Sequence, residues 1–366
     1  MFEFTKLGGI ATLTVGYVGN MTQEYTGSGV PFLRSLNIKP FHISESDIRY
    51  ISEEFNMKIK KSVLRENDVV IVRTGIPGTC CVVPKEYDGC NCSDIVIVHP
   101  DKTKVHPDYL AAYINVWGQK QISNNKVGAI QQHFNVRMAE DMLIALPPLK
   151  EQKKIAEIIK NINEKIFLNQ RINDNLHQQA QLVFDYMFPD ISCGPSTIGD
   201  EIIPKRGKPL LSKDAIIGNV PVVAGGLEPA TYHNIANTLA PVLTISGSGA
   251  NAGFVNLWHI PIWSSDSSYI DSTMTPYVYF WFALLKRRQQ DIFNVQTGSA
   301  QPHIYPKHIA ELSLSTIDYA LVQDYTTKVT PLFSAIGRNY QETKQLQSLR
   351  DWLLPMLMNG QATIDD

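Results

Sequence analysis

The sequence predicts an α+β protein in which two related, β-rich globular domains are separated by two long helices that pair antiparallel as a coiled coil. Three observations lead to this prediction. One segment recurs at a fixed distance along the chain, two long stretches carry apolar residues at helical spacing, and the other segments combine β-branched runs with glycine-rich turns. The predicted order is therefore domain, helix, domain, helix.

The repeat is clearest between residues 127–134 and residues 297–304, which share a glycine, a glutamine and a histidine in place at an offset of 170 residues. The same offset continues without a gap into the two helical stretches. A repeat on this scale indicates that the chain folds as two copies of one arrangement.

The β-rich domains are predicted at residues 1–145 and 191–315. The run from Val69 to Val72 and the run from Val242 to Ile245 are rich in β-branched residues, and glycines follow each run. Such runs are typical of strands that lead into hairpin turns. These parts of the two copies agree only after gaps are introduced.

The long helices are predicted at residues 146–190 and 316–360. Their apolar positions step four, three, four, three, which is the spacing of a coiled-coil seam. A polar residue interrupts each seam at the same place, as expected for a residue that fixes the register of paired helices. The predicted seam contains Ile155, Ile159, Ile162, Ile166, Asn169, Leu176, Val329, Leu332, Ile336, Asn339 and Leu346.

An antiparallel pairing is expected because a parallel one would force the second domain to carry the chain back along the whole first helix. That distance is roughly 50 Å at about 1.5 Å per residue. The second helical pattern contains Pro331 and Gly337, so we expect a kink or an interruption near Pro331.

Composition narrows the functional classes. The formal net charge is −2, so any basic surface must be local. The amino terminus lacks the layout of a secretory signal, and the longest apolar run, Tyr277 to Leu285, is less than half of a bilayer span. We therefore expect a cytoplasmic protein without a membrane segment, whose five cysteines are reduced thiols.

No catalytic or metal-binding residue is predicted in this chain. An amino-methyltransferase would need an aromatic residue after Pro147-Pro148, where Leu149 follows instead. A nucleotide-binding loop would need a lysine that the glycine-rich residues 247–253 lack, and a hairpin turn is a simpler interpretation of that segment than a phosphate cradle. The spacing of Cys80-Cys81 and of the cysteines at 90 and 92 matches no standard zinc site, which leaves buried thiols as the alternative.

Residues 146–156, Leu-Pro-Pro-Leu-Lys-Glu-Gln-Lys-Lys-Ile-Ala, with the asparagine-containing seam that follows, resemble the specificity subunits of type I restriction–modification systems. The two-copy layout is similar to that family over nearly the whole chain. The second copy departs from the pattern, because Leu314 to Tyr319 stand where the first has the Pro-Pro-Leu-Lys-Glu-Gln run.

The resemblance implies that each globular domain is a target-recognition domain that binds one half of a split double-stranded DNA sequence. It implies that the helices set the spacing of the half-sites and dock two methyltransferase subunits, and that restriction and translocase subunits can join the complex. It further implies that this chain binds no cofactor, with S-adenosylmethionine, ATP and Mg²⁺ held by the partner subunits.

Candidate DNA-binding residues follow from the two-copy logic. Donor-bearing residues that differ between the copies and lie near turns are candidates for reading bases, because arginine can grip guanine and asparagine can grip adenine with two hydrogen bonds. Each one singly is more often an ordinary surface residue. These candidates are Arg34, Arg73 with Thr74, Lys205, Arg206, Lys208, Ser246, Ser248 and Asn251. Residues repeated in both copies suit phosphate positioning or a structural role, and these are Gln131, His133, Gln301 and His303.

Two other functions compete with DNA recognition. A coiled-coil adaptor with two β-rich heads would bind proteins only, and the slightly acidic charge favours it; salt-dependent DNA binding would separate the two. A free-standing enzyme is disfavoured because no nucleophile, metal or acid–base group stands at a recognisable spacing.

Overall fold

The computed structural model describes residues 2–118, 121–122, 134–298, 301–362 and 364. The chain divides into two compact units. Unit 1 comprises Met1–Phe167 and Lys344–Asp366, and unit 2 comprises Leu168–Thr343. Each unit therefore contains one β-rich part and a portion of each long helix.

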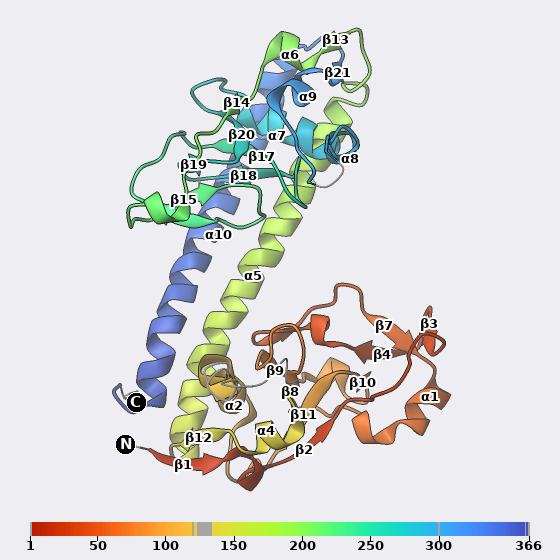
Figure 1. The fold of residues 1–366 in the computed structure, drawn as a ribbon, viewed down its shortest axis with the longest axis vertical. Helices are drawn as coiled ribbons and strands as arrows, with labels where there is room; N and C mark the ends of the chain where they lie inside the picture. The colour runs from red at the N-terminus through yellow and green to blue at the C-terminus, as the bar shows by residue number, and fades with distance from the viewer. Residues whose placement is uncertain (1, 119–120, 123–133, 299–300, 363, 365–366) are drawn as a thin grey trace. The chain divides into compact units, whose positions relative to one another are not determined.

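Unit 1 is built on a four-stranded antiparallel sheet in the order β2-β11-β8-β9 (Figure 1). Its strands are β2 (Ala11–Val15), β11 (Ile95–Pro100), β8 (Val69–Val72) and β9 (Cys80–Val82). Helix α2 (Pro107–Tyr113) packs against β8 and β9. The β8 and β11 strands are buried on both faces, which explains why they read as continuous apolar runs.

A second sheet of unit 1 has the order β10-β4-β7-β3, with β10 parallel to β4. Its strands are β10 (Asn91–Cys92), β4 (Val30–Leu33), β7 (Arg49–Ile51) and β3 (Tyr25–Thr26). The other elements of this unit are β1 (Glu3–Lys6), η1 (Leu7–Gly9), η2 (Ser35–Asn37), β5 (Ile38–Lys39), β6 (His42–Ile43), α1 (Glu53–Lys58), η3 (Lys60–Ser62), η4 (Lys85–Tyr87), η5 (Ile114–Gly118), α4 (Val136–Glu140) and β12 (Leu143–Leu146).

Unit 2 repeats this plan with the sheet order β14-β20-β17-β18, formed by β14 (Lys205–Arg206), β20 (Ser267–Asp271), β17 (Val242–Ser246) and β18 (Val255–Trp258). Its second sheet, β16-β15-β19, contains β16 (Thr231–His233), β15 (Val220–Val223) and β19 (Trp263–Ser264), and β15 is parallel to β19. The other elements are β13 (Ser196–Thr197), α6 (Ile198–Glu201), η6 (Ser212–Asp214), α7 (Val278–Arg287), α8 (Gln289–Asn294), α9 (Pro306–Ala310) and β21 (Ser313–Leu314).

The repeat seen in the sequence is a repeat of backbone structure. Helices α4 and α9 begin 170 residues apart, and so do the two long helices, α5 (Leu149–Met187) and α10 (Tyr319–Met358). The amide of Leu7 donates to the carbonyl of Met142 at 2.8 Å, and the amide of Ile198 donates to that of Leu312 at 2.9 Å. The two acceptors are again 170 residues apart, so the same backbone hydrogen bond joins the beginning and the end of the β-rich part in each unit.

The long helices run antiparallel in each unit. In unit 2, Asn173 Oδ1 accepts a hydrogen bond from Asn339 Nδ2 at 2.9 Å, while Tyr325, earlier on α10, donates to the carbonyl of Ala180, later on α5, at 3.4 Å. In unit 1, Asn163 on α5 accepts from Arg350 on α10 at 2.9 Å. These contacts confirm the predicted α+β fold with two antiparallel helices.

The predicted seam residues occupy two levels of burial. Ile155, Ile159, Ile162, Ile166, Asn169, Val329 and Ile336 are buried, and Leu176, Leu332, Asn339 and Leu346 are half-buried. The sequence pattern missed Phe184, Val322 and Phe333, which are also buried. Phe184 and Phe333 belong to the core of unit 2, so packing against a β-rich part widens the buried stripe beyond a two-helix seam.

Of the kink or interruption predicted near Pro331, the interruption is wrong, because α10 is one continuous helix from Tyr319 to Met358, and the kink stays a prediction. Pro331 is exposed, while Val329 and Phe333 on either side of it are buried. Tertiary packing thus holds the helix across the missing amide. The glycine at position 337 is explained by a close approach to His259. A Cβ at Gly337 would lie 2.9 Å from the Cβ of His259, so only glycine allows this distance.

None of the helices in the described part of the chain is long and apolar enough to cross a membrane.

Candidate nucleic-acid interface

The turn after β8 holds a compact polar group in unit 1. Arg73 and Thr74 follow the last residue of β8, and Gly75 then takes a positive φ of 83°. The Thr74 hydroxyl donates to Asp94 Oδ2, and Arg73 Nη1 lies 4.0 Å from Asp94 Oδ1. Arg73 Nε also donates to the carbonyl of Phe134 at 3.1 Å. The arginine is therefore held from two sides.

Asp94 stands immediately before β11 in a left-handed conformation, with φ of 55°. The Ser35 hydroxyl donates to its carbonyl at 2.7 Å and lies 3.2 Å from its Oδ2. This carboxylate, which directly precedes β11, therefore contacts groups from the β8 turn and from the segment after β4.

The turn after β17 carries a matching group in unit 2. Ser248 donates its hydroxyl to Asp266 Oδ2, and Arg206 Nη2 donates to Asp266 Oδ1. Gly249 takes a φ of 82°, and the chain returns along β18 in an antiparallel hairpin. The hairpin interpretation of residues 247–253 is therefore correct.

Arg206 comes from β14 and lies over the backbone of Gly247. A Cβ at Gly247 would collide with the guanidinium nitrogens of Arg206, so the glycine leaves the space that the arginine fills. The Arg206 guanidinium carbon also lies 6.0 Å from the centre of the Tyr305 ring. Its neighbours Lys205 and Lys208 are exposed, which gives this edge of unit 2 a local positive charge.

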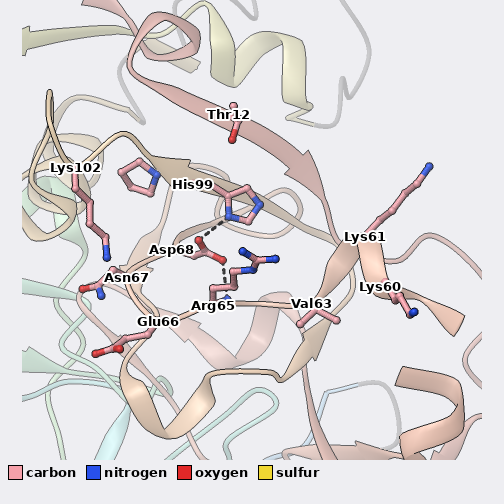
Figure 2. Close-up of a pocket in the computed structure, with 11 residues that line it drawn as sticks. Thr12, Lys60, Lys61, Val63, Arg65, Glu66, Asn67, Asp68, His99 and Lys102 are labelled. Atoms are coloured by element: carbon pink, nitrogen blue, oxygen red, sulfur yellow. Dashed lines mark hydrogen bonds and ion pairs between the residues drawn. The ribbon is translucent and has the colours of Figure 1, made fainter. Parts of the chain in front are cut away.

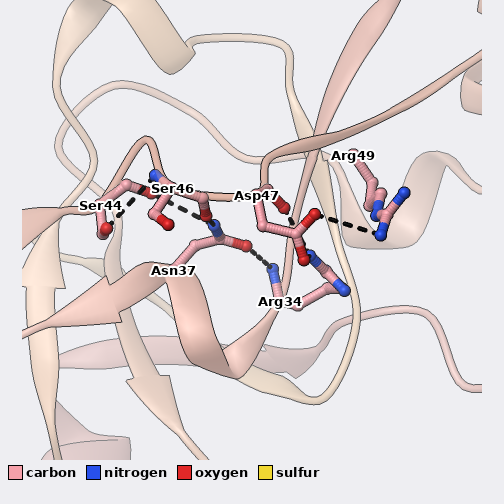
Figure 3. A network of polar contacts seen from close by, with 6 residues as sticks. All are labelled: Arg34, Asn37, Ser44, Ser46, Asp47 and Arg49. Carbon is pink, nitrogen blue, oxygen red and sulfur yellow. Dashed lines mark hydrogen bonds and ion pairs between the residues drawn. The ribbon is translucent and has the colours of Figure 1, made fainter. Parts of the chain in front are cut away.

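Arg34 belongs to a separate network, shown in Figure 3. Its Nη2 lies 2.9 Å from Asp47 Oδ2, and Arg49 Nη2 lies 3.1 Å from Asp47 Oδ1. The hydrogen bond from Arg34, with the positive charge of Arg49 as a smaller contribution, lowers the pKa of Asp47. Asn37 fixes the loop by accepting from the Arg34 amide at 3.0 Å and donating to two loop carbonyls.

The remaining predicted DNA-binding residues differ in how far solvent reaches their side chains. Ser246 is 4% exposed at the end of β17, so its hydroxyl is a poor candidate for reading a base. Asn251 is half-buried in the β17–β18 hairpin, and Gln301 is exposed. The backbone of His303 exchanges two hydrogen bonds with Thr297, at 3.0 and 2.8 Å. Gln131 and His133 lie outside the described residues.

A basic cavity of about 470 Å³ lies at the other end of β8 and β11 in unit 1 (Figure 2). Lys60, Lys61, Arg65 and Lys102 line it, and within the described ranges no ion pair joins these four to a carboxylate. Buried Asp68 accepts from the Arg65 amide at 2.8 Å, and its Oδ1 lies 2.6 Å from His99 Nδ1. Cations without carboxylate partners are the groups that neutralise DNA phosphates.

Four of the five cysteines are buried thiols. Cys80, Cys81, Cys90 and Cys92 are buried, and burial raises the pKa of each thiol, to about 11 for Cys90. Protonated thiols are poor metal ligands and poor nucleophiles. In the part of the chain that the structure describes, no group of three or more metal-ligating side chains gathers.

The sequence pattern missed Asp94, Asp266 and the cavity cations. A signal for the two aspartates exists, because Ser93-Asp94 and Ser265-Asp266 each directly precede the central strand that pairs with the β8 or β17 run. The cavity had no comparable signal, since its cations come from separate segments that only the fold brings together.

Comparisons with known proteins agree with this architecture. Residues 1–178 match the family described as the type I restriction modification DNA specificity domain. A protein of Mycoplasma pneumoniae named as a type I specificity subunit is 23% identical over 313 residues, covering 80% of this chain and 83% of that protein. The HindI specificity subunit of Haemophilus influenzae is 25% identical over 214 residues, covering 56% of this chain and 45% of that protein.

A solved structure supports the fold over the full length. The crystal structure of a type I restriction–modification S subunit from M. genitalium gives a TM-score of 0.61 at 15% sequence identity, and the match covers 100% of this chain and 97% of that chain. The sequence match shows that residues 1–178 belong to the family of the type I restriction modification DNA specificity domain, and the structural likeness shows the same fold over the whole chain.

Proposed function

We propose that this chain selects the DNA sequence on which a type I restriction–modification complex acts, with unit 1 and unit 2 each binding one half of a two-part double-stranded site. The proposal rests on the observation that both units repeat one sheet order and bring an arginine, a hydroxyl and an aspartate together beside the turn after β8 or β17. Two copies of one binding surface suit a site that has two halves.

The chain's role in this proposal is recognition, and the chemistry belongs to other subunits. Methyltransferase subunits would supply S-adenosylmethionine chemistry, and restriction and translocase subunits would supply ATP- and Mg²⁺-dependent steps. The antiparallel helices α5 and α10 would set the distance between the half-sites and offer a docking surface. Long helices with mixed charge, such as Lys160 beside Glu164 at 3.8 Å, suit that purpose.

The adaptor alternative makes a different prediction about DNA. A specificity subunit must bind duplex DNA with an affinity that falls as salt rises, because phosphate neutralisation releases counterions. An adaptor would show no such dependence. The similarities to type I specificity subunits do not favour the adaptor.

Base-modification mapping of the source genome, with this gene intact and deleted, tests the function directly. Deletion should abolish methylation at one split motif with an unspecified spacer. An unchanged map, with the partner methyltransferase shown to be expressed, would overturn the proposal. Exchanging residues before Leu146 with those of a related subunit should change one half of the motif and leave the other half intact.

The basic cavity of unit 1 has a separate role in this proposal. Contacts from Lys61 and Lys102 to phosphates would strengthen binding to every sequence equally. The double variant Lys61→Gln/Lys102→Gln should therefore weaken binding to cognate and unrelated duplexes by the same factor. A change in the recognised motif would show instead that the cavity reads bases.

A further inference from the structure

The two polar groups around Asp94 and Asp266 occupy the same place in the same fold. In unit 1, Ile95 pairs with Val72 at the end of β8, and in unit 2, Ser267 pairs with Ser246 at the end of β17. These registers make Asp94 and Asp266 equivalent positions in the two copies of the repeat. They also match Thr74 with Ser248 and Gly75 with Gly249, and both glycines adopt nearly the same positive φ.

The neighbouring strands confirm this correspondence. The amide of Gly16 donates to the carbonyl of Ile95 at 2.8 Å, and the amide of Gly207 donates to that of Ser267 at 2.8 Å. A Cβ at Gly16 would lie 3.0 Å from the carbonyl oxygen of Cys92, and one at Gly207 would lie 2.5 Å from that of Ser264. Cys92 and Ser264 each stand two residues before their unit's aspartate.

The arginine is the exception to this point-by-point match. In unit 1 it is Arg73, whose counterpart in unit 2 is Gly247. In unit 2 it is Arg206, whose counterpart in unit 1 is Val15, because Val15 pairs with Val96 as Arg206 pairs with Ser268. One guanidinium group therefore comes from the turn after β8 and the other from β14, which corresponds to β2, and both reach the same carboxylate position. Common descent alone would keep the arginine at one sequence position, so its return from another strand points to a shared task.

We infer that Asp94 and Asp266 are equivalent positioning residues of the two DNA-contact centres, and that each restrains its arginine until a DNA sequence fits. This inference rests on the proposed function. The carboxylate fixes the guanidinium and hydroxyl in one orientation, which lowers the entropy lost when they bind. Its negative charge also opposes attraction of the arginine to phosphates of any sequence, so that contact depends on fit.

Exposure agrees with this role. The side chains of Asp94 and Asp266 are 42% and 37% exposed, so each pair lies at the surface where a duplex can reach it. Arg73 and Arg206 are 19% and 37% exposed. A guanidinium has five N–H donors, so an arginine paired with one carboxylate keeps donors for a base or a phosphate.

Asp94→Asn and Asp266→Asn in the full-length protein test the inference. Each change frees one arginine to neutralise a phosphate, so the slope of log affinity against log salt for an unrelated duplex should steepen by about 0.9. Between 50 and 200 mM salt, the loss of affinity should therefore be about 3.5-fold larger than for the unchanged protein. The discrimination between the cognate and the unrelated duplex should decrease in both variants.

Matched controls separate location from total charge. Asp141→Asn breaks a pair with Lys6 at 2.8 Å in unit 1, and Asp324→Asn breaks a pair with Lys328 in unit 2, and neither lies at a β8 or β17 turn. Both remove the same charge and should leave the slope unchanged. Adding Arg73→Gln to Asp94→Asn should return the slope to that of the unchanged protein, because the effect acts through that arginine.

The outcomes separate a failure of the proposed function from a failure of this inference alone. If the unchanged protein shows no salt-dependent DNA binding, the proposed function fails and this inference fails with it. If it binds but the slopes of both aspartate variants match those of the controls, only the inference is overturned. A lower melting temperature with equal losses of affinity for all duplexes would assign the aspartates a purely structural role, and this too would overturn it.

Discussion

Substituting Gly337 with alanine sets two opposing effects against each other in the middle of α10. Helix propensity alone predicts that Gly337→Ala stabilises the protein by about 1 kcal/mol, because alanine loses less backbone entropy. The structure predicts the opposite sign. The new Cβ would lie 2.9 Å from the Cβ and 3.1 Å from the Cγ of His259, atoms that cannot move without shifting the backbone or the ring.

Overpacking of this kind costs roughly 1–3 kcal/mol. After the propensity gain is subtracted, Gly337→Ala should lower the free energy of unfolding by about 1 kcal/mol. In a domain of this size, the midpoint of thermal unfolding should then fall by roughly 2–4 °C. Far-UV circular dichroism of the full-length protein, during heating, gives this midpoint.

Two further variants make the result decisive. Ala335→Gly in the same helix measures the propensity term at a nearby position and should destabilise the protein by about 1 kcal/mol. In a His259→Gly background, where the opposing Cβ is absent, Gly337→Ala should be stabilising. If Gly337→Ala raises the melting midpoint of the otherwise unchanged protein, the close approach of His259 to α10 is wrong.

Three other predictions follow from burial. Burial, with a smaller contribution from the nearby charge of His177, lowers the pKa of His259 from an ordinary 6.5 to about 4, so the folded state favours the neutral ring. The stability that comes from the neutral ring is complete above pH 6.5 and is lost as the pH falls towards 4, by at most about 3 kcal/mol. The free energy of unfolding of His259→Gln should therefore fall less over that pH range than that of the unchanged protein. An equal fall in both proteins would contradict the assignment. Among the five cysteines, iodoacetamide should modify Cys193, which is exposed, and modify the four buried ones only after unfolding, as peptide mass spectrometry can show. Asn173→Leu alone should destabilise unit 2 by roughly 1–3 kcal/mol, because it leaves the Asn339 amide without its hydrogen-bond partner at 2.9 Å. The double variant Asn173→Leu/Asn339→Leu should leave the free energy of unfolding in urea nearly unchanged, and an equal loss of stability in both variants would contradict a paired seam.

The sequence predicted the repeat and the helices because these depend on periodic patterns that local residues carry. The seam from Ile155 to Asn169 is buried at every predicted position, since a stripe at this spacing must face a partner helix. Pro331 shows where local reasoning fails. Its intrinsic cost for a helix is real, but the buried neighbours Val329 and Phe333 hold the helix in place, and their packing is visible only in three dimensions.

The candidate site could be predicted in part. The sequence predicts Arg73, Thr74, Arg206 and Ser248 as single donors near turns, and the fold brings them into two matching groups. The carboxylates that gather them were not predicted, because a polar residue before a strand has many ordinary uses. The sequence repeat does not pair Arg73 with Arg206, because Arg73 lies in the turn after β8 and Arg206 lies on β14, the counterpart of β2.

The paired aspartates also explain why the net charge is a poor guide for this chain. A charge of −2, taken alone, argues against a DNA-binding surface, because phosphate neutralisation needs cations. Yet each of the three arginines chosen as base readers, Arg34, Arg73 and Arg206, lies beside an aspartate. If those carboxylates restrain the arginines, acidic residues at the interface are part of the recognition device. The total charge then reflects a demand for selectivity over affinity, and an excess of positive charge would weaken that selectivity by favouring every sequence alike.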